Sequence, residues 1–348
     1  MRPWHAALAV FTACSLGCIA LDFSPDGKTL AFAWPLDNDT GLALIGTDGT
    51  SFKYVSAGDG TLAKWSPNGR QIAYTSDEGV RVLDVASGRS TLVVPDGGGR
   101  VAWSEDGRKL ATLVRVEESN DRYQVLWYDL DAKAVTLRSP TPPIDPNSAS
   151  FFGLVWIPRN SGLAFVASSS SGSDVYLMEA GETRRLTTTG DVIGLALEPG
   201  GRRLVWARES RNPKYILLTL YAFDLVDRGV ARLPFPERVK GVNPAPRTGP
   251  KSVDLVRFAP DLSQMLVWTT SDSGSGNGNV YCIRRDGSGA FVVGKTAKDN
   301  KVESILMATW SPDGTRIASL WASDKTWRLQ IQASDGSGAK TLRTQRAK

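Results

Sequence analysis

The sequence predicts an all-β protein of the β-propeller class with seven four-stranded blades. The 348-residue chain repeats seven times a unit made of an apolar strand, a turn resembling Ser-Pro-Asp-Gly and a second apolar strand. The proline-equivalent positions of these units lie about 48 residues apart on average, a spacing typical of propeller blades. No stretch keeps helical periodicity of its apolar residues over three turns. Together these observations favour a ring of similar antiparallel sheets.

The clearest unit is Trp310-Ser311-Pro312-Asp313-Gly314, which precedes an apolar strand. Six further copies follow the same order with increasing divergence, at residues 23–27, 65–69, 103–107, 156–159, 197–201 and 258–261. Proline fixes φ at the first corner of such a turn, and glycine accepts the positive φ that lets the chain return. Copies spread around a ring cannot converge on one substrate. The turn aspartates are therefore interpreted as structural rather than catalytic.

Each unit has room for four short strands. In the second unit we expect strands at residues 62–66, 71–75, 80–85 and 91–94, and in the last at 306–310, 316–321, 327–332 and 340–342. Asp48-Gly49, Asp286-Gly287 and Asp335-Gly336 are expected to turn the third strand into the fourth. A small residue recurs in the second strand, as at Ala31, Ala73 and Ala318, which predicts close approach between neighbouring blades. Both ends of the chain supply whole blades, so the sequence gives no sign of strand exchange, and how the ring closes stays open.

Residues 1–18 resemble a secretory signal peptide, with one positive charge and a short apolar run. Ser15-Leu16-Gly17-Cys18 resembles a lipobox, which predicts lipidation of Cys18; an ordinary cleaved signal and a misassigned start are the alternatives. The propeller is expected over 19–344 and a basic tail over 345–348. Cys282 would then be the only cysteine of the mature chain, and we expect it buried in a strand. The expected location is secreted or periplasmic, with or without a lipid anchor in the outer membrane.

The Trp-Ser-Pro-Asp-Gly units, their Ile-Ala-Phe-like second strands and a terminal Arg185-Leu186-Thr187 resemble the WD40-like (PD40) repeats of TolB-type propellers. Similar repeats occur in the propellers of prolyl-oligopeptidase-like enzymes. The resemblance covers about residues 19–344 and implies a periplasmic protein-interaction module. TolB-type propellers commonly have six blades, so six is the alternative count. Neither the N-terminal domain of TolB nor the hydrolase domain of the peptidases is expected in this chain.

Alternate loops of a propeller emerge on opposite faces. The short turns between strands 1 and 2 and between strands 3 and 4 share one face, and the irregular connections share the other. Long loops on a rigid frame often carry binding sites, so we expect an envelope protein or peptide to bind the irregular face. The candidate binding residues are Arg115, Asp121, Arg208, Arg211, Lys214, Arg238, Lys240 and Arg247. For the Pro-rich stretch 234–251, a tolerated insertion with solvated charge is the alternative.

Composition excludes several chemistries. The only histidine is His5, inside the leader, so the mature chain cannot run a Ser-His-Asp mechanism or form histidine metal sites. No nucleotide-binding fingerprint occurs, and we expect no cofactor. Asp37-Asn38-Asp39 lacks the later carboxylates of a calcium loop and reads as an Asx turn. The positive net charge lies largely at the chain ends, which disfavours nucleic-acid binding.

These arguments favour a non-enzymatic interaction scaffold that is monomeric and touches a membrane only through an N-terminal lipid. Two alternatives stay open. Loop carboxylates could serve a glycan hydrolase or lyase; the residues concerned are Asp37, Asp39, Glu117, Glu118 and Asp121. A ligand-sensing propeller separated from a catalytic partner domain is the other.

Overall fold

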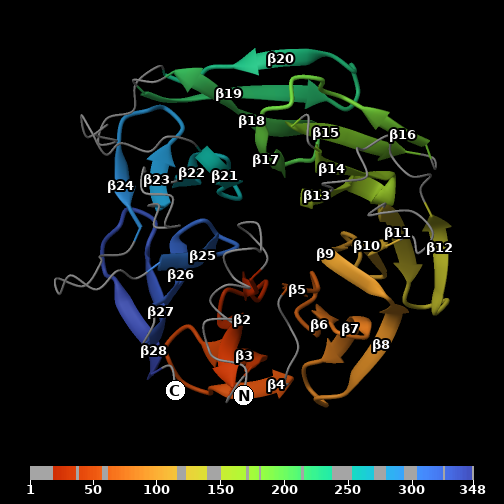
Figure 1. Cartoon of the computed structure of the whole chain (residues 1–348), viewed down its shortest axis with the longest axis vertical. Coiled ribbons are helices and arrows are strands. Elements are labelled where there is room, and N and C mark those ends of the chain that lie inside the picture. The colour runs from red at the N-terminus through yellow and green to blue at the C-terminus, as the bar shows by residue number, and fades with distance from the viewer. Residues whose placement is uncertain are drawn as a thin grey trace.

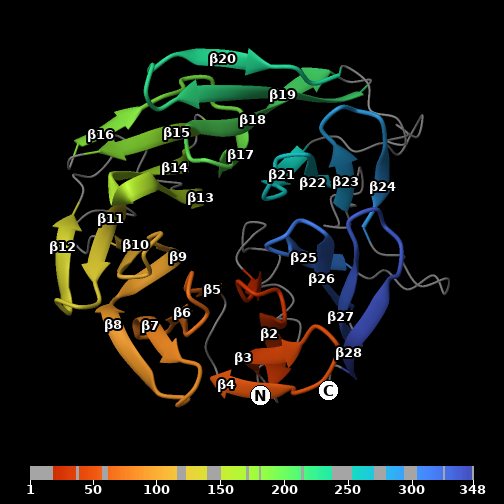
Figure 2. The ribbon, with the colours of Figure 1, turned by 180° about the vertical axis from the view of Figure 1, so that it is seen from behind.

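Seven four-stranded antiparallel sheets stand around a common axis in the computed structural model (Figures 1 and 2). The structure describes residues 19–36, 39–56, 62–115, 123–138, 150–169, 172–179, 182–212, 215–236, 253–269, 280–293, 304–323 and 326–346. The sheets confirm the predicted all-β class and the count of seven blades. Within the described ranges the one helical segment is the short 3-10 turn η1 (Pro158–Asn160).

Blade 1 comprises β1 (Leu21–Phe23), β2 (Thr29–Leu36), β3 (Asp39–Gly46) and β4 (Lys53–Ser56). Blade 2 comprises β5 (Ala63–Trp65), β6 (Gln71–Ser76), β7 (Gly79–Asp84) and β8 (Ser90–Pro95). Blade 3 comprises β9 (Gly97–Trp103), β10 (Lys109–Arg115), β11 (Tyr123–Asp129) and β12 (Ala134–Arg138). Blades 4 and 5 comprise β13 (Ser150–Ile157), β14 (Gly162–Ser169), β15 (Gly172–Glu179) and β16 (Glu182–Arg185); and β17 (Val192–Leu197), β18 (Arg203–Asn212), β19 (Tyr215–Asp224) and β20 (Val230–Leu233). Blades 6 and 7 comprise β21 (Val253–Phe258), β22 (Gln264–Thr269), β23 (Val280–Arg284) and β24 (Ala290–Val292); and β25 (Ser304–Trp310), β26 (Arg316–Ala322), β27 (Thr326–Ala333) and β28 (Lys340–Arg346).

Every blade takes its four strands from consecutive sequence, including the first and the last. The ring therefore closes without strand exchange. The strands expected in the second and last units are present, with ends shifted by a few residues. The expected boundary at residue 344 is too early, because β28 pairs with β27 up to Arg346. This pairing includes Gln345 and Arg346, which the sequence places in a basic tail.

The second strands form the buried centre of each blade. Ala31, Ala73 and Ala318 are fully buried, as the recurrent small residue predicted. Larger apolar residues on either side fill the space between blades. Between blades 3 and 4, for example, the rings of Trp127 and Trp156 lie 4.9 Å apart. The core is thus a series of inter-blade layers rather than one central cluster.

The repeated turn is a closed hydrogen-bond network. In the last blade the Ser311 hydroxyl donates to Asp313 at 2.5 Å and accepts from the Arg316 amide at 2.9 Å. Asp313 also accepts from the Thr315 amide at 3.0 Å. These bonds, led by the one from Ser311, lower the pKa of Asp313 to about 2. Gly314 has φ 70°, the positive value expected from the sequence. The aspartate serves its own turn, which supports the structural interpretation.

The same motif also joins neighbouring blades. Trp103 Nε1 donates to the Lys64 carbonyl of the preceding blade at 2.9 Å, and Trp156 Nε1 donates to that of Ala102 at 3.0 Å. A methyl group added to Gly107 would lie 3.6 Å from Pro67 Cδ, so each turn packs against the next. The tryptophan and glycine of the motif therefore set the spacing between blades as well as the local turn.

Candidate functional site

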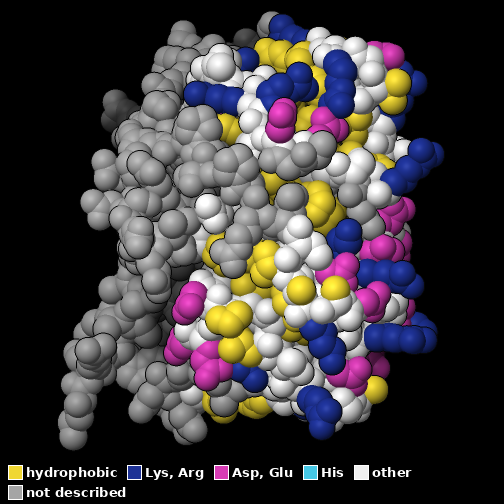
Figure 3. All heavy atoms as spheres, turned by 90° about the vertical axis from the view of Figure 1, so that its right-hand side faces the viewer, with side chains coloured by type: hydrophobic (Ala, Val, Ile, Leu, Met, Phe, Trp, Pro, Cys, Tyr) yellow, Lys and Arg dark blue, Asp and Glu magenta, His cyan; other side chains and the backbone are white. Residues whose placement is uncertain are grey.

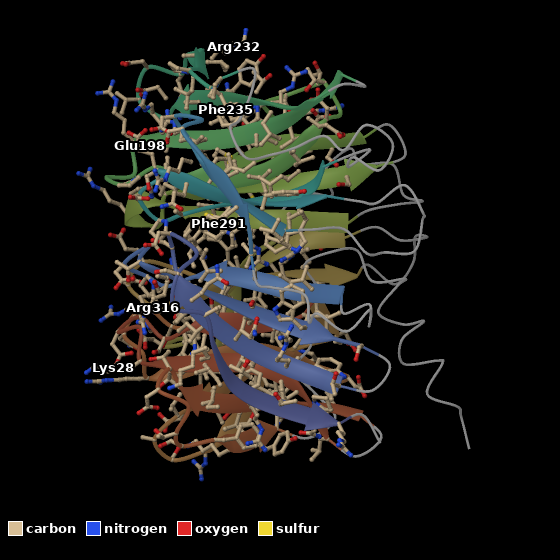
Figure 4. All side chains as sticks on the ribbon, turned by 90° about the vertical axis from the view of Figure 1, so that its left-hand side faces the viewer. Lys28, Glu198, Arg232, Phe235, Phe291 and Arg316 are labelled. Atoms are coloured by element: carbon tan, nitrogen blue, oxygen red, sulfur yellow. The ribbon has the colours of Figure 1, made fainter. Side chains whose placement is uncertain are left out.

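The two faces of the ring differ in construction. Lys28, Glu198 and Arg316 all lie at or beside turns between first and second strands, and Figure 4 shows them at the same edge of the molecule. We call this edge the turn face and the opposite one the loop face. Acidic and basic side chains are interspersed along the turn face (Figure 3). Each blade is an antiparallel sheet of four consecutive strands, so its alternate connections emerge on opposite faces, as predicted.

Of the predicted binding residues, Arg208 is the one whose side chain is described. It lies in β18, where its guanidinium forms two hydrogen bonds of 2.7 Å with Asp191. It also stacks over the Tyr221 ring at 5.2 Å. The hydrogen bond that Arg208 donates to Asp191 is the main cause that raises the pKa of Arg208. Its charge is therefore already balanced within blade 5.

The backbones of Arg115 and Arg211 belong to β10 and β18, and their side chains lie outside the described residues. The remaining candidates lie wholly outside the described ranges: Cys18, Asp121, Lys214, Arg238, Lys240 and Arg247. The same holds for Asp37, Asn38, Glu117 and Glu118 and for the side chain of Asp39. A binding role for these residues stays a prediction.

The innermost strands carry a group of charged residues that the sequence analysis did not single out. The seven innermost strands are β1, β5, β9, β13, β17, β21 and β25 (Figure 1). In β1, β5 and β9 the residue just before the motif aromatic residue is more exposed than its two neighbours. Lys64, for instance, is exposed between buried Ala63 and Trp65. The equivalent positions of the seven innermost strands form what we call the channel ring: Asp22, Lys64, Ala102, Val155, Ala196, Arg257 and Thr309.

Two charged residues of the channel ring pair with each other. Lys64 Nζ lies 2.7 Å from Asp22 Oδ1, and Asp22 Oδ2 accepts from the Trp65 amide at 3.1 Å. The Lys64 side chain is 46% exposed, whereas that of Asp22 is 16% exposed. Blades 1 and 2 therefore present a lysine ammonium whose aspartate partner is largely buried.

Arg257 is the third charged member of the ring. Its guanidinium contacts the Ala308 carbonyl at 3.4 Å and lies 5.9 Å from the Trp268 ring centre. Burial lowers the pKa of Arg257 to about 10; repulsion by Arg100 of blade 3 adds to this, and attraction by Asp22 opposes it. Charges of blades 1 and 3 thus influence the pKa of Arg257 in blade 6. The alternation of the first strands was the sequence signal that could have revealed this group.

Other features of the described residues are plainer. Cys282 is buried in β23, as predicted, and burial raises its pKa to about 12. An open hollow between blades 5 and 6 is lined by Pro234, Ser263, Gln264, Arg284, Arg285 and Asp286. No cluster of three or more His, Cys, Asp or Glu side chains suited to a metal occurs within the described ranges. Among the same residues, no helix has the length and apolar character needed to span a membrane.

No protein-family model matches the chain, and no curated protein matches it significantly. Solved structures do. The propeller domain of the Trilobed protease from Pyrococcus furiosus, described as having an open velcro topology, has TM-score 0.61 and 14% identity, covering 95% of this chain and 97% of that one. An oligogalacturonate lyase in complex with manganese has TM-score 0.61 and 15% identity, covering 86% and 84%. TolB from Acinetobacter baumannii has TM-score 0.48 and 16% identity, covering 78% and 62%. At these identities the likenesses to the protease propeller domain and to the lyase establish the β-propeller fold alone.

Proposed function

We propose that this protein is a non-enzymatic β-propeller of the cell envelope that binds a protein or peptide partner, in the manner of TolB-type propellers. The observation that carries the proposal is the repeated frame itself. The Ser-Pro-Asp-Gly turns use their polar groups internally, as Ser311 and Asp313 do, so the motif residues have structural roles. A rigid frame of this kind presents its variable connections as a binding surface.

Composition supports the same conclusion. Residues 6–348 contain no histidine, so acyl-transfer chemistry with a histidine base has no candidate in that stretch. The leader-like residues 1–18 support secretion to the periplasm, with Cys18 as the site of a lipid anchor. The proposed binding surface is the loop face, where the predicted residues Arg238, Lys240 and Arg247 supply positive charge toward an acidic partner.

Quantitative affinity capture from envelope extract tests this proposal. The bait is the full-length chain, compared with a variant carrying Arg238→Glu, Lys240→Glu and Arg247→Glu. A turn-face variant, Lys28→Glu, is the matched control because it changes an exposed cation on the opposite face. We expect one partner to be recovered at least tenfold less by the triple variant and equally by the control. Equal recovery by all three proteins would refute binding at the loop face.

A carboxylate-based glycan hydrolase or lyase is the competing proposal. Acidic residues gather in two connections that the strand order assigns to the loop face, residues 37–39 and 117–121. Two carboxylates acting as acid and base are the usual requirement of glycoside hydrolysis. A polysaccharide panel that includes oligogalacturonate separates the proposals. Turnover that is abolished by Asp39→Asn, Glu118→Gln or Asp121→Asn would establish the enzyme, and no turnover on the panel would favour the scaffold.

A further inference from the structure

The hollow between blades 5 and 6 is large enough for a small ligand. Its volume is about 600 Å³, within the range typical of small-molecule sites. Blade 5 contributes Pro234, just after its outer strand β20. Blade 6 contributes Ser263 and Gln264, where β22 begins, and Arg284, Arg285 and Asp286, where β23 ends. Both segments of blade 6 belong to the turn face, so the hollow is separate from the connections of the loop face.

The hollow lies where the Asp-Gly turn of one blade meets the outer part of the blade before it. At the interface of blades 6 and 7, Phe291 of β24 occupies this place (Figure 4): a methyl group added to Gly336 would lie 2.9 Å from its Cδ2. At the interface of blades 5 and 6, β20 already ends at Leu233, and the equivalent Gly287 packs against Pro236. A rigid proline segment thus replaces an aromatic side chain at this contact, and the hollow lies beside that segment.

The two arginines of the hollow are not required by the repeat. Blade 6 has Arg284 and Arg285 before its Asp-Gly turn, whereas blade 1 has Gly46-Thr47 and blade 7 has Ala333-Ser334. The backbone of the second residue is used in the same way in all three blades, because its amide donates to a carbonyl of the preceding turn at 2.8 to 2.9 Å. Small side chains are therefore sufficient for this turn. The two guanidiniums are an addition made in blade 6.

Several donors of the hollow are unused within the protein. Among the residues that the structure describes, neither Arg284 nor Arg285 forms a side-chain hydrogen bond or an ion pair. The oxygen Oε1 of Gln264 accepts from the Cys282 thiol at 3.0 Å, which leaves the two N–H groups of its amide as donors. The hollow therefore presents two cations and a neutral donor to a ligand.

One carboxylate also lines the hollow. Asp286 Oδ1 accepts from the Ser288 amide at 2.9 Å, and this bond is the main cause that lowers the pKa of Asp286. Attraction by Arg284 contributes to the same shift. Asp286 is consequently ionised at neutral pH, and its carboxylate can accept a further hydrogen bond from a hydroxyl group. Two positive charges and one negative charge thus line the same space.

We propose that the hollow binds a phosphorylated sugar, with Arg284 and Arg285 holding the phosphate and Asp286 accepting a hydrogen bond from a sugar hydroxyl. A phosphate monoester carries almost two negative charges at pH 7 and has three acceptor oxygens, so it can engage both guanidiniums at once. A carboxylate is satisfied by the fork of a single arginine. Gln264 supplies a further N–H donor.

The phosphorylated sugar can be a soluble molecule or the head group of a lipid. The inference goes beyond the scaffold proposal and does not depend on it. The loop-face variants leave the hollow unchanged, and variants of the hollow leave Arg238, Lys240 and Arg247 unchanged, so the two proposals can fail separately.

Isothermal titration calorimetry with the full-length chain tests the site. The probes are glucose 1-phosphate, glucose, and glucuronate, which has a carboxylate on a similar body. We expect glucose 1-phosphate to bind with a dissociation constant of about 1 mM or tighter and the other two at least tenfold more weakly. Flotation with phosphatidylcholine vesicles that contain or lack lipid A, a phosphorylated sugar lipid, identifies the source. Binding of glucose 1-phosphate without vesicle binding indicates a soluble ligand, and additional binding of only the lipid A vesicles indicates a head group; both results support the site.

Variants separate a specific site from general attraction to anions. The double variant Arg284→Ala with Arg285→Ser copies the residues of blade 7, so the turn should fold as it does there. It should weaken glucose 1-phosphate binding at least tenfold, about 1.4 kcal/mol, and abolish any flotation with lipid A vesicles. Arg285→Lys should lose less, because it keeps the charge but not the fork. Arg89→Gln is the matched control, since Arg89 is an exposed arginine in the corresponding connection of blade 2, between β7 and β8.

Four outcomes would each overturn the proposal. The first is no binding of glucose 1-phosphate, and the second is binding of glucose or glucuronate as tight as that of the phosphate. The third is unchanged affinity in the double variant. The fourth is an equal loss in Arg89→Gln, which would show that overall charge rather than the hollow attracts the ligand.

Discussion

Two interfaces of the ring are built from the same repeat but differ in connectivity. The chain passes directly from blade 2 to blade 3, whereas blades 7 and 1 are the two ends of the propeller and meet only in space. Both keep the packing of proline on glycine. A methyl group on Gly107 would lie 3.6 Å from Pro67 Cδ, and one on Gly27 would lie 3.8 Å from Pro312 Cδ. In its packing of proline on glycine, the closing interface between blades 7 and 1 is therefore the same as the ordinary interface between blades 2 and 3.

The two interfaces differ at the motif aromatic residue. Trp103 donates to the Lys64 carbonyl, whereas blade 1 has Phe23, which has no donor. Arg316 of blade 7 compensates: its Nη2 donates to the Gly27 carbonyl at 2.7 Å, and its guanidinium lies 5.6 Å from the Phe23 ring centre. At the interface of blades 7 and 1, a cation of blade 7 thus takes the place of the indole that blade 3 supplies at the interface of blades 2 and 3.

Further contacts near the outer edge occur where blades 7 and 1 meet. Trp34 Nε1 donates to Gln345 Oε1 at 2.5 Å, and Gln345 Nε2 donates to the Pro35 carbonyl at 3.1 Å. Lys340 Nζ donates to the Asp48 carbonyl at 2.7 Å. We call these contacts, together with those of Arg316, the closing contacts. They teach that a propeller without strand exchange can be closed by side chains placed where the chain does not continue.

The variant with the largest expected effect on stability lacks the outer strand of blade 7. Deleting residues 333–348 eliminates β28 and the Gln345 and Lys340 contacts, and it exposes one edge of β27. We expect loss of the single cooperative unfolding transition, measured by circular dichroism and tryptophan fluorescence in urea. Deleting residues 347–348 alone should change nothing. A cooperative transition with an unshifted midpoint in the long deletion would show that the closing contacts are dispensable.

The next largest expected effect on stability is that of Arg316→Gln. The variant removes a charged donor from the Gly27 carbonyl and a cation from the Phe23 ring, so the free energy of unfolding should fall by about 2 kcal/mol. Chemical denaturation measures the change. Arg232→Gln, an exposed arginine of β20, should stay within about 0.5 kcal/mol of the parent. Equal effects of the two substitutions would mean that Arg316 does not hold blades 7 and 1 together.

The sequence was sufficient for the blades because their signals are local. The turn chemistry of residues such as Ser311 and Gly314 and the alternation of short strands depend on neighbours within a few positions. Even a divergent copy keeps the backbone: Leu262, at the glycine position of blade 6, has φ 60°. The seven-blade count therefore followed from counting turns.

The contacts between distant residues were not predictable in this way. Nothing near Arg316 in the sequence indicates Gly27, and nothing near Arg257 indicates Arg100 of blade 3. Arg208 shows the same limit for the candidate site. The sequence indicates an available cation at this position, but Asp191, 17 residues earlier, accepts two hydrogen bonds from it. Pairings set by the ring geometry require the structure.

A smaller effect compares the indole donors of the two interfaces directly. Trp103→Phe removes the bond to the Lys64 carbonyl, and Trp34→Phe removes the bond to Gln345. Each should lower the free energy of unfolding by about 1 kcal/mol, because one buried acceptor loses its donor. Urea titrations of the two variants, and of the double variant, measure this. Additive effects are expected, since the sites share no partner; a much smaller loss for Trp34→Phe would show that the closing contacts are looser than the ordinary interface.

The smallest effect concerns acid stability and distinguishes the turns of blades 2 and 7. Asp313 has its pKa lowered from 3.8 to about 2 in the folded protein, mainly by the Ser311 hydroxyl. The stabilisation from this aspartate is therefore present above about pH 4 and is lost as the pH falls through about 2. Blade 2 has Asn68 at the same position, with the same bonds from Ser66 and the Arg70 amide and no titration. Asp313→Asn should consequently reduce stability slightly at pH 7 and reduce the loss on acidification, and Asn68→Asp should increase that loss. Thermal unfolding at pH 7 and pH 2.5 measures both; identical acid sensitivity in the two variants and the parent would show that the turn carboxylates do not govern it.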